Sequence, residues 1–219
     1  MATRFDGDVV IGGDLAASTM TLADASVTNA TVAAAAAIVR SKLAEDSAAV
    51  YRIPLQTCRS NTGLVLDATG GDTLFSIANG GYGVGTLTLK GEEAISETET
   101  TTLSFEFPLP PEYIAGDTIT LAATVKVDES EDGNATTETV DAACYELADD
   151  GTVGSDLIGT AAQTITTDGF VTYTWTVTAA AVSPGDKLIF FLQTIVTEDA
   201  GTAIYAVIGN IEVRLDIRG

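Results

Sequence analysis

The chain has 219 residues, of which 46% are hydrophobic and 6% aromatic, and it carries 10 basic against 31 acidic residues. A formal net charge of -21 is repelled by nucleic acid and by anionic membranes, so we expect neither as a partner. The sequence contains no histidine, which excludes Ser-His-Asp and Cys-His catalysis and histidine-ligated zinc.

The cysteines and the N-terminus indicate the compartment. Cys58 and Cys144 are too few for a disulfide framework and have no CxxC spacing, so we expect reduced thiols, with a bond between them as the alternative. The first residues contain no apolar signal segment, and no apolar run approaches the roughly 18 to 20 residues that a membrane span needs. We therefore expect synthesis in the cytoplasm, unless another system exports the protein.

Residues 1–25 are predicted to form an arm for assembly or attachment. They contain two short apolar runs separated by Gly12-Gly13-Asp14, a pattern typical of short strands joined by a tight turn. Such short strands cannot bury enough surface alone, so they need neighbours, most simply the same segment of other subunits. The apolar residues expected to make these contacts are Val9, Val10, Ile11 and Leu15.

Residues 26–49 are predicted to form an alanine-rich connector. Ser26 and Thr28 could cap a helix running from Ala33 to Leu43, because alanine has high helix propensity. We expect an intersubunit helix or an extended arm, and the alternative is a surface helix packed on its own domain. The side chains expected at the interface are those that fall along one side: Val32, Ile38, Val39 and Leu43.

Residues 50–219 are predicted to form an all-β domain, an antiparallel β-sandwich resembling a jelly roll. Short runs rich in Val, Ile, Thr, Tyr and Phe alternate there with Gly, Asp, Asn or Pro. Gly-Asp turns at Gly116 and Gly185 are each expected to start a long apolar strand, and residues 179–182 one helical turn. The predicted strands are Tyr51–Thr57, Leu64–Asp67, Thr73–Ile77, Gly85–Leu89, Thr101–Phe107, Thr118–Val127, Thr137–Leu147, Gln163–Thr166, Val171–Val177, Lys187–Thr197, Ala203–Ile208 and Ile211–Ile217.

The acidic residues do not form a convincing catalytic or metal site. Asp128, Ser130 and Asp132 have the spacing of the first half of a calcium loop, but Thr139 stands where that loop needs a bidentate glutamate. A solvated hairpin tip is the better interpretation. No acidic pair stands out for glycoside hydrolysis. We therefore predict that the protein is not an enzyme and that it binds no metal and no cofactor.

One aromatic strip offers a candidate binding site. Tyr173 and Trp175 share one face of the strand Val171–Val177, with threonines on the other face. Such a strip could stack on carbohydrate, although in a chain with a single tryptophan the more favoured interpretation is a place in the core. Saccharide-dependent quenching of the fluorescence of Trp175 would distinguish the two.

Four short stretches carry a family resemblance. They are Phe5–Leu15, Ser26–Ala30, Ala36–Ile38 and Ser41–Leu43, and in composition and order they resemble the N-terminal region of decoration or head-fibre proteins of tailed bacteriophages. The resemblance implies a structural virion protein on the capsid surface. Its N-terminal region would hold a homotrimer or bind the major capsid protein, while the β-sandwich projects outward. The alternative function is a carbohydrate-binding module of a phage tail or a secreted adhesin.

Overall fold

The computed structural model describes residues 47–60, 63, 66, 75–78, 87–129, 135–148, 151–165, 169–198 and 203–217, all within the compact unit Asp46–Gly219. The first strand begins at Ser47, before the domain boundary predicted at residue 50. The predicted arm and residues 26–46 of the connector lie outside the described residues. The interface residues predicted there, whose contacts stay predictions, are Val9, Val10, Ile11, Leu15, Val32, Ile38, Val39 and Leu43.

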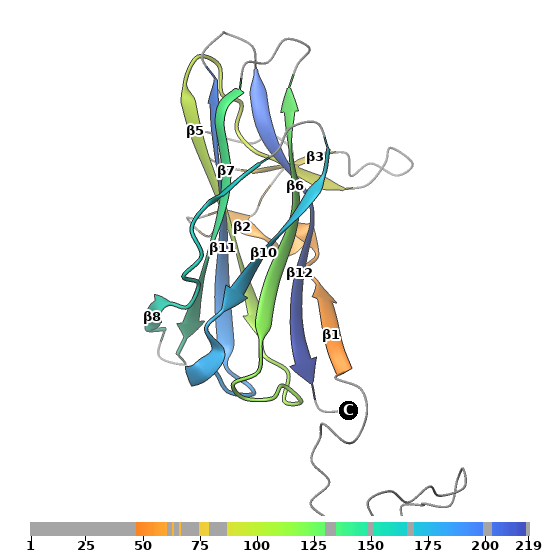
Figure 1. Ribbon diagram of the computed structural model, residues 1–219, viewed down its shortest axis with the longest axis vertical. Helices are drawn as coiled ribbons and strands as arrows, with labels where there is room; N and C mark the ends of the chain where they lie inside the picture. Colours follow the sequence, from red (N-terminus) through yellow and green to blue (C-terminus); the bar gives the residue numbers. More distant parts are fainter. Residues whose placement is uncertain are drawn as a thin grey trace, which may run out of the picture. The chain divides into compact units, whose positions relative to one another are not determined.

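The described residues form two antiparallel sheets, which confirms the predicted β-sandwich. Sheet A has the strand order β10-β6-β12-β4-β3, and β1 also pairs with β12. Figure 1 shows β6, β12 and β1 of this sheet on the right of the view. Its strands are β1 (Ser47–Arg52), β3 (Ser76–Ala78), β4 (Thr88–Lys90), β6 (Ile119–Glu129), β10 (Val171–Val177) and β12 (Ile204–Ile217).

Sheet B has the strand order β2-β5-β11-β7-β8, and β9 also pairs with β7. Figure 1 shows its three long strands β5, β7 and β11 side by side on the left. A 3-10 helix at Ala179–Ala181 confirms the expected helical turn, and a second one, η2, spans Leu55–Thr57. The strands of sheet B are β2 (Arg59–Ser60), β5 (Thr98–Pro108), β7 (Ala135–Leu147), β8 (Val153–Asp156), β9 (Gln163–Thr164) and β11 (Lys187–Glu198).

Two strand predictions are wrong. The strand predicted at Tyr51–Thr57 ends at Arg52, and Leu55–Thr57 form the 3-10 helix η2 instead. The two strands predicted at Ala203–Ile208 and Ile211–Ile217 are the single strand β12, whose register against β6 shifts between Ile208 and Asn210. This β-bulge keeps the strand paired on both sides of Gly209. A Cβ atom at Gly209 would lie 3.0 Å from the ring of Phe170, so glycine allows that ring to approach the backbone closely.

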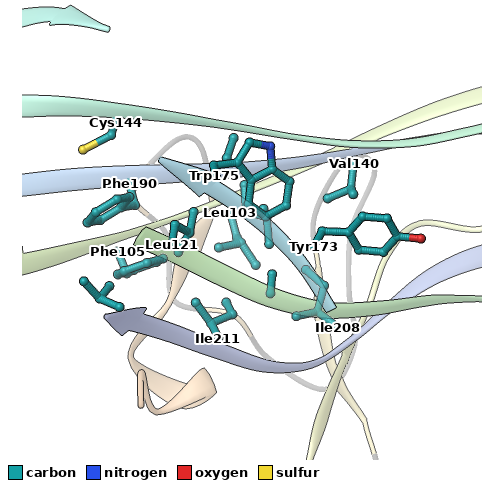
Figure 2. Packing of buried hydrophobic residues seen from close by; sticks show 14 of the residues in the cluster. Leu103, Phe105, Leu121, Val140, Cys144, Tyr173, Trp175, Phe190, Ile208 and Ile211 are labelled. Atoms are coloured by element: carbon teal, nitrogen blue, oxygen red, sulfur yellow. The ribbon is translucent and has the colours of Figure 1, made fainter. Parts of the chain in front are cut away.

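The core lies between the two sheets, as the alternation of apolar residues requires. Figure 2 shows Trp175 among Leu103, Leu121 and Val140, with contributions from both sheets. The rings of Phe105 and Phe190 stack with their centroids 5.2 Å apart. Small and medium side chains fill most of the remaining space, as expected for thin sandwich layers.

Two further sequence predictions concern local geometry. Gly116 and Gly185 have φ angles of +85° and +90°, so both Gly-Asp turns use the left-handed conformation that glycine adopts at little cost. Cys58 and Cys144 are free thiols buried in the core. Burial is the main reason that the pKa of each thiol is raised to about 12.

Candidate functional site

The outer face of β11 is unusually apolar for a surface. Along this strand, fully buried residues alternate with half-buried ones. The half-buried set faces away from the core and includes Ile189, Phe191 and Ile195. A central strand that faces water normally presents polar residues on that side, so this apolar outer face is a candidate binding surface.

A shallow groove of about 440 Å³ lies over this outer face. Its walls combine apolar and polar side chains, which is the usual composition of a ligand site. Strands β5, β7, β8 and β11 all contribute to it. We call it the aromatic groove and define it by Thr102, Asp141, Ala143, Tyr145, Val153, Ile189, Phe191 and Gln193.

The strand register explains how the groove forms. Ile189 lies opposite Tyr145, and Phe191 lies opposite Ala143. The rings of Tyr145 and Phe191 meet edge to face, with their centroids 5.8 Å apart and an interplanar angle of 81°. Because Ala143 has only a methyl group, the floor beside these two rings stays open. The rings hold each other in place, so they offer an ordered apolar surface.

The other end of the groove is polar. Gln193 lies opposite both Asp141 and Thr102, so these three side chains form one row across the sheet. The amide Nε2 of Gln193 donates a hydrogen bond to Oγ1 of Thr102 at 3.1 Å, which orients the amide. Oδ1 of Asp141 accepts one from the backbone N–H of Ala142 at 2.8 Å. The second carboxylate oxygen and the amide carbonyl can accept hydrogen bonds from a ligand.

A hollow on the outer face of sheet A is a weaker candidate. It has about 360 Å³ and is lined by side chains that include Lys90, Lys126, Phe170 and Tyr205. The ammonium of Lys126 lies 2.8 Å from a carboxylate oxygen of Asp128, and that of Lys90 is paired with Glu93. Lys90 also lies over the ring of Tyr205, 3.8 Å from its centroid. Both cations therefore already have partners within the protein.

A second charged cluster on sheet A is structural. Glu212 receives hydrogen bonds from Arg214 at 2.9 Å and from Asn210 at 2.8 Å, and Arg52 lies 3.4 Å away. The bond from Arg214, followed by that from Asn210, lowers the pKa of Glu212 below its usual value. Because Arg52 belongs to β1 and Arg214 to β12, the cluster helps to hold β1 on the sheet.

The aromatic strip predicted as a possible carbohydrate platform lies in the core. Tyr173 and Trp175 share one face of β10, as predicted, but that face packs against sheet B. Their exposed fractions are only 6% and 1% (Figure 2). A ring buried between two sheets has no free face for a sugar, so the core interpretation of this strip is confirmed.

The remaining candidates yield no site among the described residues. No group of three or more cysteine, aspartate or glutamate side chains there is arranged to hold a metal ion. Of the partial calcium loop, residues 130–134 lie outside the described part of the chain, and Asp128 is paired with Lys126. In the described ranges, no helix is long and apolar enough to cross a membrane.

Sequence reasoning missed the aromatic groove, although one pattern pointed to it. The run Leu188-Ile189-Phe190-Phe191-Leu192 is apolar at every position, whereas a strand with one wet face alternates. That run alone does not tell which of its residues face outward. It also cannot bring Tyr145 and Asp141 beside them, because these lie on a strand far away in the sequence.

Comparisons with known proteins found similar solved structures but no family. No protein-family model matches the sequence, and no curated protein is significantly similar to it. Among solved structures, a xylan-binding CBM22-1 domain from Paenibacillus barcinonensis matches 75% of this chain and 89% of its own, with 11% identity and a TM-score of 0.43. The xylan-binding module CBM15 matches 78% of this chain and 99% of its own, with 16% identity and a TM-score of 0.43. A chain of infectious bursal disease virus, Gx strain, matches 78% of this chain and 32% of its own, with 13% identity and a TM-score of 0.38.

Proposed function

We propose that this protein is a non-catalytic carbohydrate-binding β-sandwich that binds neutral glycans in the aromatic groove. The observation that carries the proposal is the edge-to-face pair of Tyr145 and Phe191 beside the polar row of Asp141 and Gln193. The proposed binding site therefore lies on the outer face of sheet B. It replaces the predicted platform of Tyr173 and Trp175, which is buried.

The chemistry of the groove suits a sugar. A pyranose ring has C–H groups on its faces, which pack on aromatic rings, and hydroxyl groups at its edge, which need hydrogen-bond partners. Tyr145 and Phe191 provide the aromatic surface on which the C–H groups can pack. Asp141 and Gln193 provide the hydrogen-bond acceptors and donors that the hydroxyl groups need. The rings are held by each other, and the Gln193 amide by Thr102, so little side-chain entropy is lost on binding.

Charge selects against acidic glycans. The chain has a net charge of -21, and Asp141 places a carboxylate inside the groove. A uronic acid or a sulfated sugar would meet repulsion both at long range and in the site. We therefore expect neutral hexose or pentose polymers as ligands.

Titration calorimetry of the full chain tests this function. The probes are xylo-, cello- and β-1,4-galacto-oligosaccharides, and the variants are Phe191→Ala and Tyr145→Ala. We expect each variant to bind at least about tenfold more weakly, which corresponds to about 1.4 kcal/mol for the loss of one ring contact. Phe170→Ala is the matched control, because it removes a 47% exposed ring outside the groove. The proposal fails if no oligosaccharide binds, or if Phe170→Ala weakens binding as much as Phe191→Ala.

A capsid decoration or head-fibre role is the second candidate, and it is compatible with glycan binding. It is favoured by the apolar runs and the alanine-rich stretch of residues 1–49, which precede the β-sandwich domain. We expect light scattering to find a homotrimer for the full chain and a monomer for a chain lacking residues 1–44. If both are monomers, the trimer is wrong. Binding of the trimer to stripped capsids would test the major capsid protein as its partner.

A further inference from the structure

A second hollow adjoins the aromatic groove on sheet B. It has about 480 Å³, and Ile189 lines both depressions. We call it the polar hollow and define it by Thr57, Arg59, Gly63, Ser104, Glu106 and Ile189. Its lining is mainly hydrophilic, whereas the aromatic groove is mainly apolar, so two depressions of different chemistry lie next to each other at Ile189.

The two depressions together run across the strands. Ile189 on β11 lies in register with Tyr145 on one side and with Glu106 on the other. The aromatic groove reaches Val153 on β8, and the polar hollow reaches Arg59 on β2, so together they cross the strand order β8-β7-β11-β5-β2. With neighbouring strands about 4.8 Å apart, their combined length is about 19 Å. This is long enough for several linked sugar rings.

The polar hollow is built on fixed backbone. Arg59 lies opposite Ser104, which places it diagonally beside Glu106 on the same sheet. Oγ of Ser104 donates to the carbonyl of Ser60 at 3.3 Å. The N–H of Gly63 donates to the same carbonyl at 2.9 Å. The exposed Arg59 and Glu106 therefore project from an ordered edge.

We infer that the aromatic groove and the polar hollow are one extended site for an internal stretch of a linear, neutral polysaccharide that lies across the strands. This inference rests on the proposed function. The rings of Tyr145 and Phe191 bind one part of the chain, and Arg59 and Glu106 bind the hydroxyl groups of the next. Arg59 offers donors and Glu106 offers acceptors, and together they add no net charge, which suits an uncharged polyhydroxyl ligand.

The length dependence of affinity tests the extended site. Calorimetry of the full chain uses the xylo- and cello-oligosaccharide series from disaccharide to hexasaccharide. We expect affinity to rise along a series that binds and then to level off. In Arg59→Ala and Glu106→Ala the affinity for the hexasaccharide should fall about tenfold, while that for the disaccharide should stay within about twofold, because a short ligand stays on the rings.

The control and the failing outcomes separate the two proposals. Lys187→Ala removes an exposed charge of β11 outside both depressions and should leave every affinity unchanged. One outcome would contradict the extended site and leave the aromatic groove supported. In that outcome oligosaccharides bind and Phe191→Ala weakens their binding, but Arg59→Ala does not change hexasaccharide affinity, or affinity does not depend on oligosaccharide length. If no oligosaccharide of either series binds, the extended site is overturned, and the β-1,4-galacto-oligosaccharides then decide whether glycan binding fails as well. Circular dichroism shows whether each exposed-residue variant is folded.

Discussion

Trp175 provides the sharpest test of the core. Its side chain is 1% exposed, and its Nε1 has no hydrogen-bond partner among the described residues. An aromatic side chain buries about 200 Å² or more, which at about 25 cal/mol per Å² contributes about 5 kcal/mol. Replacing buried aromatic residues by alanine commonly costs about 3–5 kcal/mol. We expect a loss in this range for Trp175→Ala.

Trp175→Phe should behave differently. It loses part of the apolar area, but it also removes an unpaired buried N–H, whose desolvation costs about 1–3 kcal/mol. These effects oppose each other, so we expect a net loss below about 1.5 kcal/mol. Urea unfolding followed by far-ultraviolet circular dichroism measures both losses, provided that the m-value is unchanged.

Two outcomes would refute this reasoning. A loss below about 1 kcal/mol for Trp175→Ala would contradict burial in a packed core. A loss for Trp175→Phe that equals the loss for Trp175→Ala would mean that the indole N–H makes a stabilising hydrogen bond. Phe170→Ala is the matched control and should cost little, because its ring is 47% exposed. In the wild type, a bound saccharide should leave the emission of Trp175 nearly unchanged, since the ring lies on the opposite side of sheet B from the groove.

Three further predictions concern titration, thiols and a turn. The pKa of Glu212 is lowered in the folded state, chiefly by the hydrogen bond from Arg214. The ionised carboxylate should therefore stabilise the domain at pH values above its ordinary pKa of about 4.3. This contribution should be lost as the pH falls through the lower pKa of the folded state. Unfolding in urea between neutral and acidic pH should therefore show a smaller acid-induced loss for Glu212→Gln than for the wild type, and equal losses would contradict the assignment. Cys58 and Cys144 should not react with an aromatic disulfide reagent at pH 8 in the folded protein, because burial raises the pKa of each thiol to about 12. Both thiols should react in denaturant. Rapid labelling of the native protein would contradict their burial. Gly185→Ala should cost about 1–2 kcal/mol in thermal or urea unfolding, because the φ of +90° is strained for alanine, and a neutral result would show that the turn adopts another conformation.

Local patterns were sufficient for most of the strands. Alternation in the Thr101–Phe107 and Ile211–Ile217 segments placed apolar side chains on one face, and both segments lie in strands β5 and β12. The Gly-Asp turns were also predictable, because positive φ angles select glycine. The bulge at Gly209 was not, since it is a shift in the register of β12 against β6, a strand that is distant in the sequence.

The candidate site shows where local patterns stop. The strip of Tyr173 and Trp175 has the composition of a sugar platform, but a strand has two faces, and only packing against the second sheet shows that this one is buried. The pair of Tyr145 and Phe191 is invisible in the sequence because register between β7 and β11 creates it.

By itself, the sequence determined the fold class, the turn chemistry and the exclusion of histidine-based catalysis, because these follow from composition and short-range periodicity. Only the tertiary structure decided which aromatic residues face solvent and which polar groups lie beside them. Burial and cross-strand neighbours are set by the pairing of distant segments. The candidate binding surface therefore lies on the outer face of β7 and β11 in sheet B, and not on β10 of sheet A as the sequence suggested.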